Sequence, residues 1–519
     1  MPPINHPRRF HSKLIPQSTV AVTALIISVS IADSLLLGYD SSLMGALNVM
    51  PAYTSYFTLN TATKSLNTAI SYIGGAVASF PAGFLGDFLG RKKAIVLSCI
   101  FTIIGAIIQT AAQNIAMFII GRFIIGVGLG IGAVSVPTYI AETAPEKWRA
   151  VALGLYLSNW AVGTIIASAI GWRTEQIDST WAWRGPSLIQ VFWALLCVIL
   201  LLFVPESPRW LIGKDRHEEA LEALAIVNAQ GDKNHPVVIL HYREITDTVA
   251  WEKTEGNQLS LKDAYLYPSN RKRLMLATTF SIIVMFPGTL IITYYFGDML
   301  TLAGITDVTS QLQVNIILQI WTWLNSITGA WLLGRMRRKL QASLSMVGQI
   351  ITFFIFAGLV ALYGSSTNTS GTYGAIAMMF LYNAAYGLGI NALISTYPPE
   401  VLSYRIRSTG MGLYTFCNRV GGVFVTMVFP FAMDAMGWKF YILNAAVDIL
   451  MLAFIIYFWV ETYGLTLEEI DVKFDGVKHS DVPDLKDLLN GDRKAVEALI
   501  QDINPTEENM TTTIIVDEK

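Results

Sequence analysis

Long apolar runs separated by short polar segments dominate the chain. Twelve of these runs reach the length at which an α-helix crosses a hydrocarbon core about 30 Å thick. The pattern therefore predicts an all-α membrane protein with twelve transmembrane helices. The predicted spans are residues 20–45, 67–86, 94–112, 115–140, 150–171, 186–204, 274–297, 312–334, 341–363, 373–396, 407–433 and 438–460.

Composition agrees with this pattern, since 53% of the 519 residues are hydrophobic and only 14% are charged. Lys and Arg gather in alternate loops, as they do on the cytoplasmic side of membrane proteins. Both termini are therefore expected in the cytoplasm, and the basic N-terminal segment is expected to precede an uncleaved anchor helix. The expected inner basic residues are Arg91, Lys92, Lys93, Lys147, Arg149, Arg335, Arg337, Arg338, Lys339, Arg405 and Arg407.

Two pairs of segments far apart in the chain resemble each other. PTYIAETAPEKWRA (137–150) and STYPPEVLSYRIRS (395–408) share Thr-Tyr, then Glu, then Arg at the same spacing. VPESPRWL (204–211) and VETYGLTLEE (460–469) repeat at nearly the same offset. The chain is therefore predicted to be a duplicated six-helix unit with a substrate site between its halves, near the membrane midplane.

One long polar loop separates the halves. It contains KDRHEEALEALAIVNAQ, in which Ala220, Leu221, Leu224 and Ala225 recur at helical spacing, so we expect a short amphipathic helix that acts as a solvated cytoplasmic linker. No phosphate-binding Gly-rich loop occurs, so ATP-driven transport has no support, and no enzyme is expected. The predicted parts are residues 1–19, 20–204, 205–273, 274–460 and a cytoplasmic tail, 461–519.

Cysteine and histidine placement indicates neither a disulfide framework nor a metal site. Cys99, Cys197 and Cys417 all fall in predicted helices, and the 6 His lie in the termini or the central loop. No cofactor is expected beyond a proton as coupling ion. Asn368 starts an outward Asn-Thr-Ser sequon, whose glycosylation the sequence leaves open.

Several charged and Gly-rich motifs occur along the chain in the order, and at the positions relative to the predicted membrane helices, that are typical of one known family. They are GFLGDFLGRKK (83–93), GRFIIGVGLG, PTYIAETAPEKWRA, PESPRWL and ETYGLTLEE. Together they resemble the sugar porter family of the major facilitator superfamily, most closely its fungal hexose and disaccharide permeases, over about residues 25–470. The resemblance implies alternating access and a cytoplasmic gate of ion pairs. Its matching residues are Asp87, Arg91, Glu142, Arg149, Glu206, Arg209, Glu400, Arg407 and Glu461.

Asp40 in GYD and Arg122 in GR match an acid and an arginine of that family. An unpaired Asp at a helix centre costs about 2.5–3.5 kcal/mol, so an Arg partner or protonation is expected. A partner that moves during transport would make the carboxyl bind and release a proton. The two residues are therefore interpreted as a proton-coupling pair, with a structural ion pair in a facilitator as the alternative. Asp33, on the same helix face, is interpreted as a pore-facing polar residue.

The substrate-contacting positions depart from the family. Val284 and Met285 replace a Gln pair, Pro287 is introduced, and Leu157 replaces an amide. Each sugar hydroxyl left unpaired costs about 1–3 kcal/mol, which weakens the case for an ordinary hexose. The candidate substrate-binding residues are Asn159, Thr289, Tyr294, Tyr295, Thr322, Asn391, Ser395, Asn418 and Arg419.

Two further residues bear on mechanism. Arg419, a cation inside a predicted membrane helix, is interpreted either as a partner for a substrate carboxylate or as a structural partner for Asp33 or Asp448. In the second half Gly334 stands where the family has an acid, so a looser gate is expected there.

Proton-coupled import of a sugar or sugar-like small solute is the function that the sequence favours. The alternatives on the same fold are a facilitative sugar uniporter and a transporter, in either direction, of an organic acid or secondary metabolite. A non-transporting sugar sensor is disfavoured, because the acidic tail is short. The expected partners are a small-molecule substrate and the lipid bilayer of the plasma membrane, with no nucleic acid, and the chain is expected to act as a monomer.

Overall fold

A computed structural model describes residues 14–255, 265, 267–364, 369–394, 396–403, 406–465, 470, 473 and 474. Its regular structure in these residues is helical, with no strand, and 12 helices are long and apolar enough to cross a membrane. This confirms the predicted all-α membrane fold. The chain divides into two compact units after Tyr463, and the long helices all belong to the first.

The first six long helices precede the central loop, and the rest follow it. The first set is α1 (Thr19–Val49), α3 (Thr61–Leu89), α4 (Arg91–Thr110), α5 (Ile115–Thr143), α6 (Glu146–Glu175) and α7 (Trp181–Leu201), with α2 (Pro51–Thr54) between the first two. The second set is α12 (Pro268–Met285), α15 (Val308–Leu333), α16 (Arg338–Tyr363), α17 (Thr369–Leu388), α20 (Arg407–Met436) and α21 (Lys439–Phe458), with short α13 (Thr289–Tyr294), α14 (Phe296–Leu302), α18 (Ile390–Leu393) and α19 (Tyr397–Val401).

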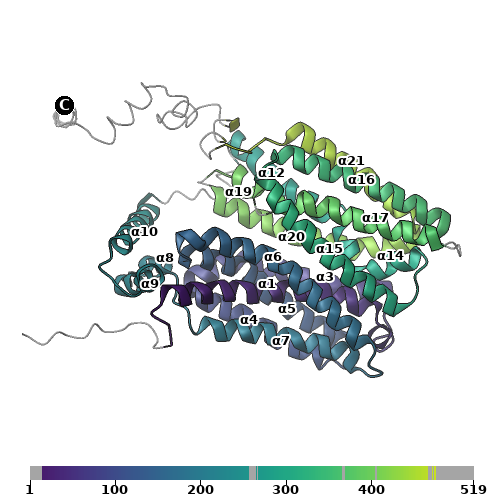
Figure 1. The fold of residues 1–519 in the computed structure, drawn as a ribbon, viewed down its shortest axis with the longest axis horizontal. Helices are drawn as coiled ribbons and strands as arrows, with labels where there is room; N and C mark the ends of the chain where they lie inside the picture. The colour runs from purple at the N-terminus through teal and green to yellow at the C-terminus, as the bar shows by residue number, and fades with distance from the viewer. Residues whose placement is uncertain are drawn as a thin grey trace, which may run out of the picture. The chain divides into compact units, whose positions relative to one another are not determined.

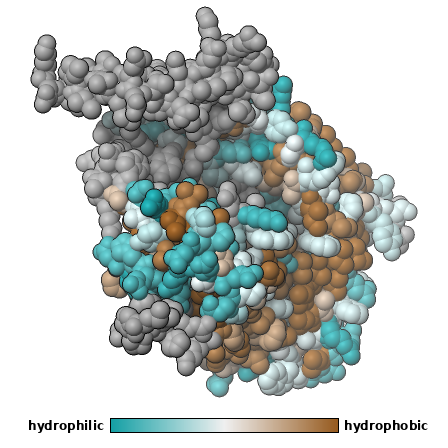
Figure 2. All heavy atoms as spheres, turned by 60° about the vertical axis from the view of Figure 1, so that its left-hand side comes forward, coloured by the Kyte–Doolittle hydropathy of each residue, from teal (hydrophilic) through white to brown (hydrophobic). Residues whose placement is uncertain are grey.

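The two sets form neighbouring bundles, purple to blue and green to yellow in Figure 1. Within the first, α4 packs on α5 and α1 on α6, and within the second, α16 packs on α17 and α21. The bundles meet where α3 packs on α20 and α6 on α15. Large apolar side chains remain exposed on the outer faces, as the brown surface in Figure 2 shows, and Phe80 and Phe84 on α3 are 77% and 73% exposed. Lipid tails are the environment in which such faces are stable.

Local sequence explains where several helices begin. Asn60 caps α3, because its side chain accepts a hydrogen bond from the Thr63 backbone N at 2.9 Å and Thr63 bonds back to the Asn60 backbone. Asn114 caps α5 in the same way through Met117 N at 2.9 Å. These caps lie at the end of the bundle opposite the central loop, which we call the far end. The end that carries the central loop is the loop-side end.

Two of the predicted spans, 274–297 and 373–396, are present but contain breaks in the helix. After α12 the chain passes through Pro287, which lacks an N–H, and Gly288, whose φ is +103°, before α13 begins. A Cβ on Gly288 would lie 2.5 Å from the Phe353 ring, so a side chain has no room there. The hydrophobic run continues through both interruptions, which is why the apolar pattern misses them.

The central loop forms three helices rather than one solvated linker helix. They are α8 (Pro208–Gly213), α9 (His217–Ala229) and α10 (Pro236–Glu255). The predicted face of α9 is buried at Ala220 and Leu224, but Ile226 and Val227 are buried as well, against the core beneath α1. Thr19 of α1 donates to the Ile226 carbonyl at 3.1 Å. The interpretation as a solvated linker is therefore wrong, because α9 docks on the first bundle.

Candidate functional site

A fully buried ion pair lies inside the first bundle. Arg122 on α5 donates from Nη1 to Asp40 Oδ1 on α1, and the two residues are 1% and 4% exposed. The Arg122 Nε has no hydrogen-bond partner among the described residues. The structure thus brings together the two residues that the sequence singled out as a coupling pair.

Two tyrosines connect this pair to the second bundle. The Tyr72 hydroxyl on α3 and the Tyr294 hydroxyl on α13 lie 3.1 Å apart in a hydrogen bond, with their rings nearly perpendicular. Both phenols interact electrostatically with Asp40 and Arg122. A change of charge at the Asp40–Arg122 pair therefore changes the electrostatic potential at the Tyr72–Tyr294 hydrogen bond between the bundles.

Asp33 has a different partner. It is 1% exposed and accepts a hydrogen bond from the Tyr156 hydroxyl on α6 at 3.3 Å. Arg419 makes no ion pair with Asp33 or Asp448 in the described part of the chain, although a structural pairing was one of its interpretations. Asp448 is fully buried, and both of its carboxylate oxygens lack a hydrogen-bond partner there.

Two of the proposed substrate residues bond within their own helices. The side chains of Asn159 and Thr322 bond to backbone carbonyls one turn earlier, Leu155 and Leu318, at 2.8 Å each. The Tyr295 hydroxyl donates to the Thr426 carbonyl at 2.9 Å, which ties the segment after α13 to α20. Tyr294 therefore contacts the first bundle, whereas Tyr295 lies between α20 and Lys64 of α3, whose Nζ is 5.9 Å from the centre of its ring.

The remaining candidates are less constrained. Asn391 on α18 donates to the Ser326 hydroxyl of α15 at 2.9 Å, and the buried Thr289 hydroxyl has no hydrogen-bond partner among the residues that the structure describes. Asn418 and Arg419 lie half-buried near the middle of α20. Ser395 lies outside the described residues.

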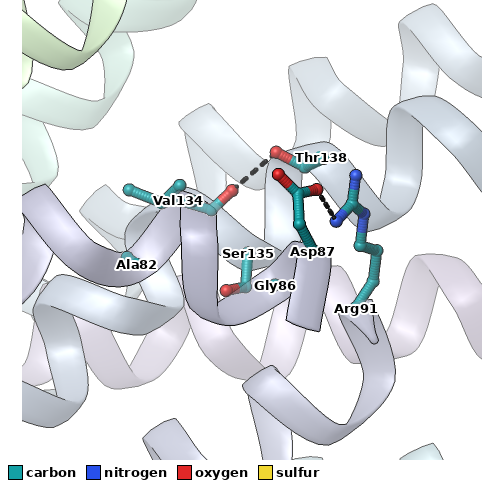
Figure 3. A pocket seen from close by; sticks show the side chains of 8 residues that line it. Ala82, Gly86, Asp87, Arg91, Val134, Ser135 and Thr138 are labelled. Carbon is teal, nitrogen blue, oxygen red and sulfur yellow. Dashed lines mark hydrogen bonds and ion pairs between the residues drawn. The ribbon is translucent and has the colours of Figure 1, made fainter. Parts of the chain in front are cut away.

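A cluster of ion pairs and hydrogen bonds around Arg91 connects helix ends at the loop-side end of the first bundle. Arg91 binds both oxygens of Glu142 at 3.0 Å and contacts Asp87 at 2.5 Å. Ser207 donates to the same Glu142 at 2.5 Å. Figure 3 shows Asp87 and Arg91 beside a pocket of about 100 Å³ between α3 and α5. We call these residues, with Glu206, the Arg91 cluster.

Glu206 joins the same cluster through backbone groups. Its carboxylate accepts from the backbone N–H groups of Lys92 and Ser207 at 3.0 Å each. Burial raises the pKa of the Glu206 carboxyl, and these two N–H donors act in the opposite direction. The Glu206 carboxylate therefore connects the start of α4 to the start of the central loop, although burial disfavours its charged form.

The second bundle carries a matching cluster around Arg338. Arg338 contacts Glu400 at 3.2 Å, and Thr462 donates to Glu400 at 2.6 Å. Glu461 accepts from the backbone N–H groups of Arg338 and Lys339 at 2.8 and 3.2 Å. We call these residues the Arg338 cluster, which repeats the Arg–Glu pair, the hydroxyl donor and the Glu bound to backbone N–H groups of the Arg91 cluster.

The second bundle has Gly334 at the position that corresponds to Asp87, and hydrogen bonds to backbone carbonyls replace part of the lost ion pair. The Arg338 Nη1 donates to the Leu333 carbonyl, and Tyr463 donates to the Gly334 carbonyl at 3.0 Å. Trp210 likewise donates to the Asp87 carbonyl at 2.9 Å in the first bundle. Sequence reasoning missed Arg338 as a gate residue, although it lies four positions after Gly334, just as Arg91 lies four positions after Asp87.

The other predicted gate residues are Arg149, Arg209 and Arg407. Arg149 is exposed at the start of α6 and is not drawn into the Arg91 cluster. Arg209 lies half-buried in α8. The side chain of Arg407 lies outside the described part of the chain.

The bundles are joined toward the far end. Lys64 on α3 pairs with Asp298 on α14 at 2.7 Å, and Thr61 donates to Asp434. Asn315 donates to Ser168 at 3.0 Å. Within the described residues, the hydrogen bonds and ion pairs that connect the bundles all lie from the Tyr72–Tyr294 contact outward to this end. The far end is therefore closed in this conformation.

Comparison with known proteins agrees with this geometry. A family model described as "Sugar (and other) transporter" matches residues 25–474. The chain is 28% identical to the MFS-type transporter criB of Aspergillus cristatus, covering 85% of this chain and 90% of that protein. It is 29% identical to the sugar transporter STL1 of Saccharomyces cerevisiae, covering 85% and 79%.

The fold also matches solved transporter structures. The inward-open xylose transporter XylE of E. coli aligns with a TM-score of 0.72 at 20% identity, over 87% of this chain and 100% of that one. At this identity the likeness establishes the fold alone. Since the family model spans most of the sequence, the chain belongs to the sugar transporter family of the major facilitator superfamily.

Proposed function

We propose that this transporter imports a sugar or sugar-like solute together with protons, and that Asp40 and Arg122 couple the two. The observation that carries the proposal is the buried Asp40–Arg122 pair, which lies within electrostatic reach of the Tyr72–Tyr294 contact between the bundles. Protonation of Asp40 would release Arg122 and change the field at that contact. XylE, which shares the fold, is a proton:xylose symporter.

The loop-side end is assigned to the cytoplasm, and the membrane is expected to be the plasma membrane. Lys and Arg concentrate at this end, where the Arg91 and Arg338 clusters lie, and basic loops stay on the cytoplasmic side. With its far end closed, the described conformation then faces inward. Alternating access would open the far end by rocking one bundle against the other.

The two loop-side clusters are proposed to act as the gate. Each holds one bundle together internally in the inward-facing conformation. When the bundles approach on this side, the same charged groups would become available for contacts across the interface. The gate residues are Asp87, Arg91, Glu142, Glu206, Arg338, Glu400 and Glu461.

Uptake measurements test the coupling. The full-length protein is expressed in cells that lack their own sugar transporters, and labelled sugars are supplied with and without a proton uncoupler. We expect uncoupling to abolish accumulation, and Asp40→Asn to abolish it while leaving exchange of sugar across the membrane. Each proton moving down the potential supplies about 2.3 kcal/mol per 100 mV, enough for measurable accumulation. Uptake that is unaffected by the uncoupler and by Asp40→Asn would identify a facilitator instead.

A further inference from the structure

We infer that Arg419 binds an anionic group of the substrate, and that the transported solute is a sugar acid, a polyhydroxylated molecule with a carboxylate. The inference rests on the proposed transport function and names the substrate class of the same pathway. It is carried by the position of Arg419, by its lack of a partner and by the groups around it.

Arg419 lies at the boundary between the bundles, near the membrane midplane. It is twelve residues from the start of the 30-residue α20, or about 18 Å along the helix. Its side chain lies against Gly75 on α3 of the other bundle, where a Cβ would meet Arg419 Cδ at 3.5 Å and Nε at 3.6 Å. One turn further along α20, Gly422 packs against the Tyr72 ring. The guanidinium therefore crosses to the first bundle just on the loop side of the Tyr72–Tyr294 contact.

No protein group neutralises Arg419 in the described structure. Two other arginines inside the bundles each pair with a carboxylate, Arg122 with Asp40 and Arg91 with Glu142. Arg419 makes neither an ion pair nor a hydrogen bond with the described residues and is only half-buried. A cation inside the membrane is expensive unless it meets a partner, so an anion from outside the protein is the ligand that suits it.

Two phenol groups, those of Tyr72 and Tyr156, lie within electrostatic reach of this cation. Tyr72 shares its hydroxyl hydrogen bond with Tyr294, and Tyr156 donates to Asp33. Phenol hydroxyls both donate and accept, so they can bind sugar hydroxyls beside the guanidinium.

The chemistry of the altered site favours a carboxylate over a neutral sugar. Val284 and Met285, at the end of α12, have apolar side chains that cannot satisfy sugar hydroxyls. The planar guanidinium binds both oxygens of a carboxylate at once, which adds affinity and orientation. The charge of Arg419 can therefore supply binding energy that these apolar side chains cannot.

Transport by the purified full-length protein in proteoliposomes tests this inference. Counterflow of labelled D-gluconate and labelled D-glucose is compared for the wild type, Arg419→Gln and Arg419→Lys, with the exposed far-end Arg173→Gln as the matched control. We expect gluconate to be preferred, and Arg419→Gln to weaken gluconate affinity by about 10- to 100-fold, the effect of losing a charged hydrogen bond. Arg419→Lys should retain part of the preference, and Arg173→Gln should retain all of it.

Each other outcome has a distinct meaning. Transport of glucose without gluconate overturns the inference and leaves the proposed function standing. Gluconate transport that Arg419→Gln leaves unchanged also overturns it. A loss of thermal stability in Arg419→Gln that Asp33→Asn restores would make Arg419 a structural counter-ion and overturn it as well. Transport of neither solute, with an unrelated compound carried instead, would contradict the proposed function itself.

Discussion

A carboxylate and a guanidinium buried in the membrane interior stabilise the fold only as a pair. Asp40 and Arg122 are both nearly inaccessible, and no other described carboxylate pairs with Arg122. Removing one partner therefore leaves a charge without compensation, whereas neutralising both leaves two polar groups that can still bond to each other.

Arg122→Ala is expected to be destabilising for this reason. The free energy of unfolding should fall by about 3–5 kcal/mol, and the double variant Asp40→Asn with Arg122→Gln should recover most of it. Thermal unfolding of the detergent-solubilised protein measures both. Equal losses in the single and double variants would show that the pair contributes through packing alone.

Sequence reasoning located these residues because an acid and an arginine are rare in apolar helices. It could not find the Tyr72–Tyr294 contact, because tyrosines are common in such helices and these two lie 222 positions apart. It also could not assign Asn159 or Thr322 to backbone hydrogen bonds within their own helices, since the same polar side chains serve substrates equally well.

At the scale of elements, the interruption between α12 and α13 depends on Gly288. Its φ of +103° is unfavourable for other residues, and the Phe353 ring occupies the place of a side chain. Gly288→Ala should cost at least about 1–3 kcal/mol of stability and slow transport, because the substitution strains the break. Gly412→Ala is the matched control, since a Cβ there meets nothing within 4 Å. Equal unfolding temperatures for the two variants would contradict this prediction.

The Arg91 cluster should make stability depend on pH through Glu206. Burial raises the pKa of this carboxyl in the native state, so the native state binds its proton more tightly than the unfolded chain does. Its contribution to stability is full at low pH and is lost as pH rises through the native pKa.

The unfolding temperature of the wild type, relative to Glu206→Gln, should therefore fall as pH rises from about 4 to about 8. The exposed Glu218→Gln serves as the control and should track the wild type. A difference between wild type and Glu206→Gln that stays constant across this range would refute the link.

Helix number and approximate position followed from the apolar pattern, because a bilayer imposes one length on every span. Breaks within spans did not follow, since Pro287 and Gly288 sit inside an uninterrupted hydrophobic run. The helices α8 and α10 were missed because short amphipathic segments show their buried face only once the surface that covers them is known.

For the whole molecule, the contacts at the far end determine which side is open. The side chains of Lys64 and Asp298 are 19% and 44% exposed, so their pair contributes only about 0.2–1 kcal/mol. Lys64→Glu should therefore shift the population toward a conformation that is open at the far end by up to about fivefold, and Asp298→Lys should restore it. Spin labels at the exposed far-end residues Ser55 and Ala435 report the separation. An unchanged distance distribution in Lys64→Glu would rule out a role for this pair.

The repeated motifs predicted the duplication, but they could not give the conformation, because both conformations obey the same sequence pattern. Which end is closed depends on contacts between residues of different bundles, such as Asn315 with Ser168. None of these residues belongs to a motif that marks them as partners.

The docking of α8 and α9 on the first bundle makes the covalent link between the bundles dispensable in principle. The Arg91 cluster and Thr19 fasten these helices to one side, and the Arg338 cluster closes the other bundle by itself. A transporter cut between Glu255 and Pro268 would consist of two self-contained pieces that present complementary apolar faces. Co-expressed as separate polypeptides, they should find each other in the bilayer and transport as a reassembled pair.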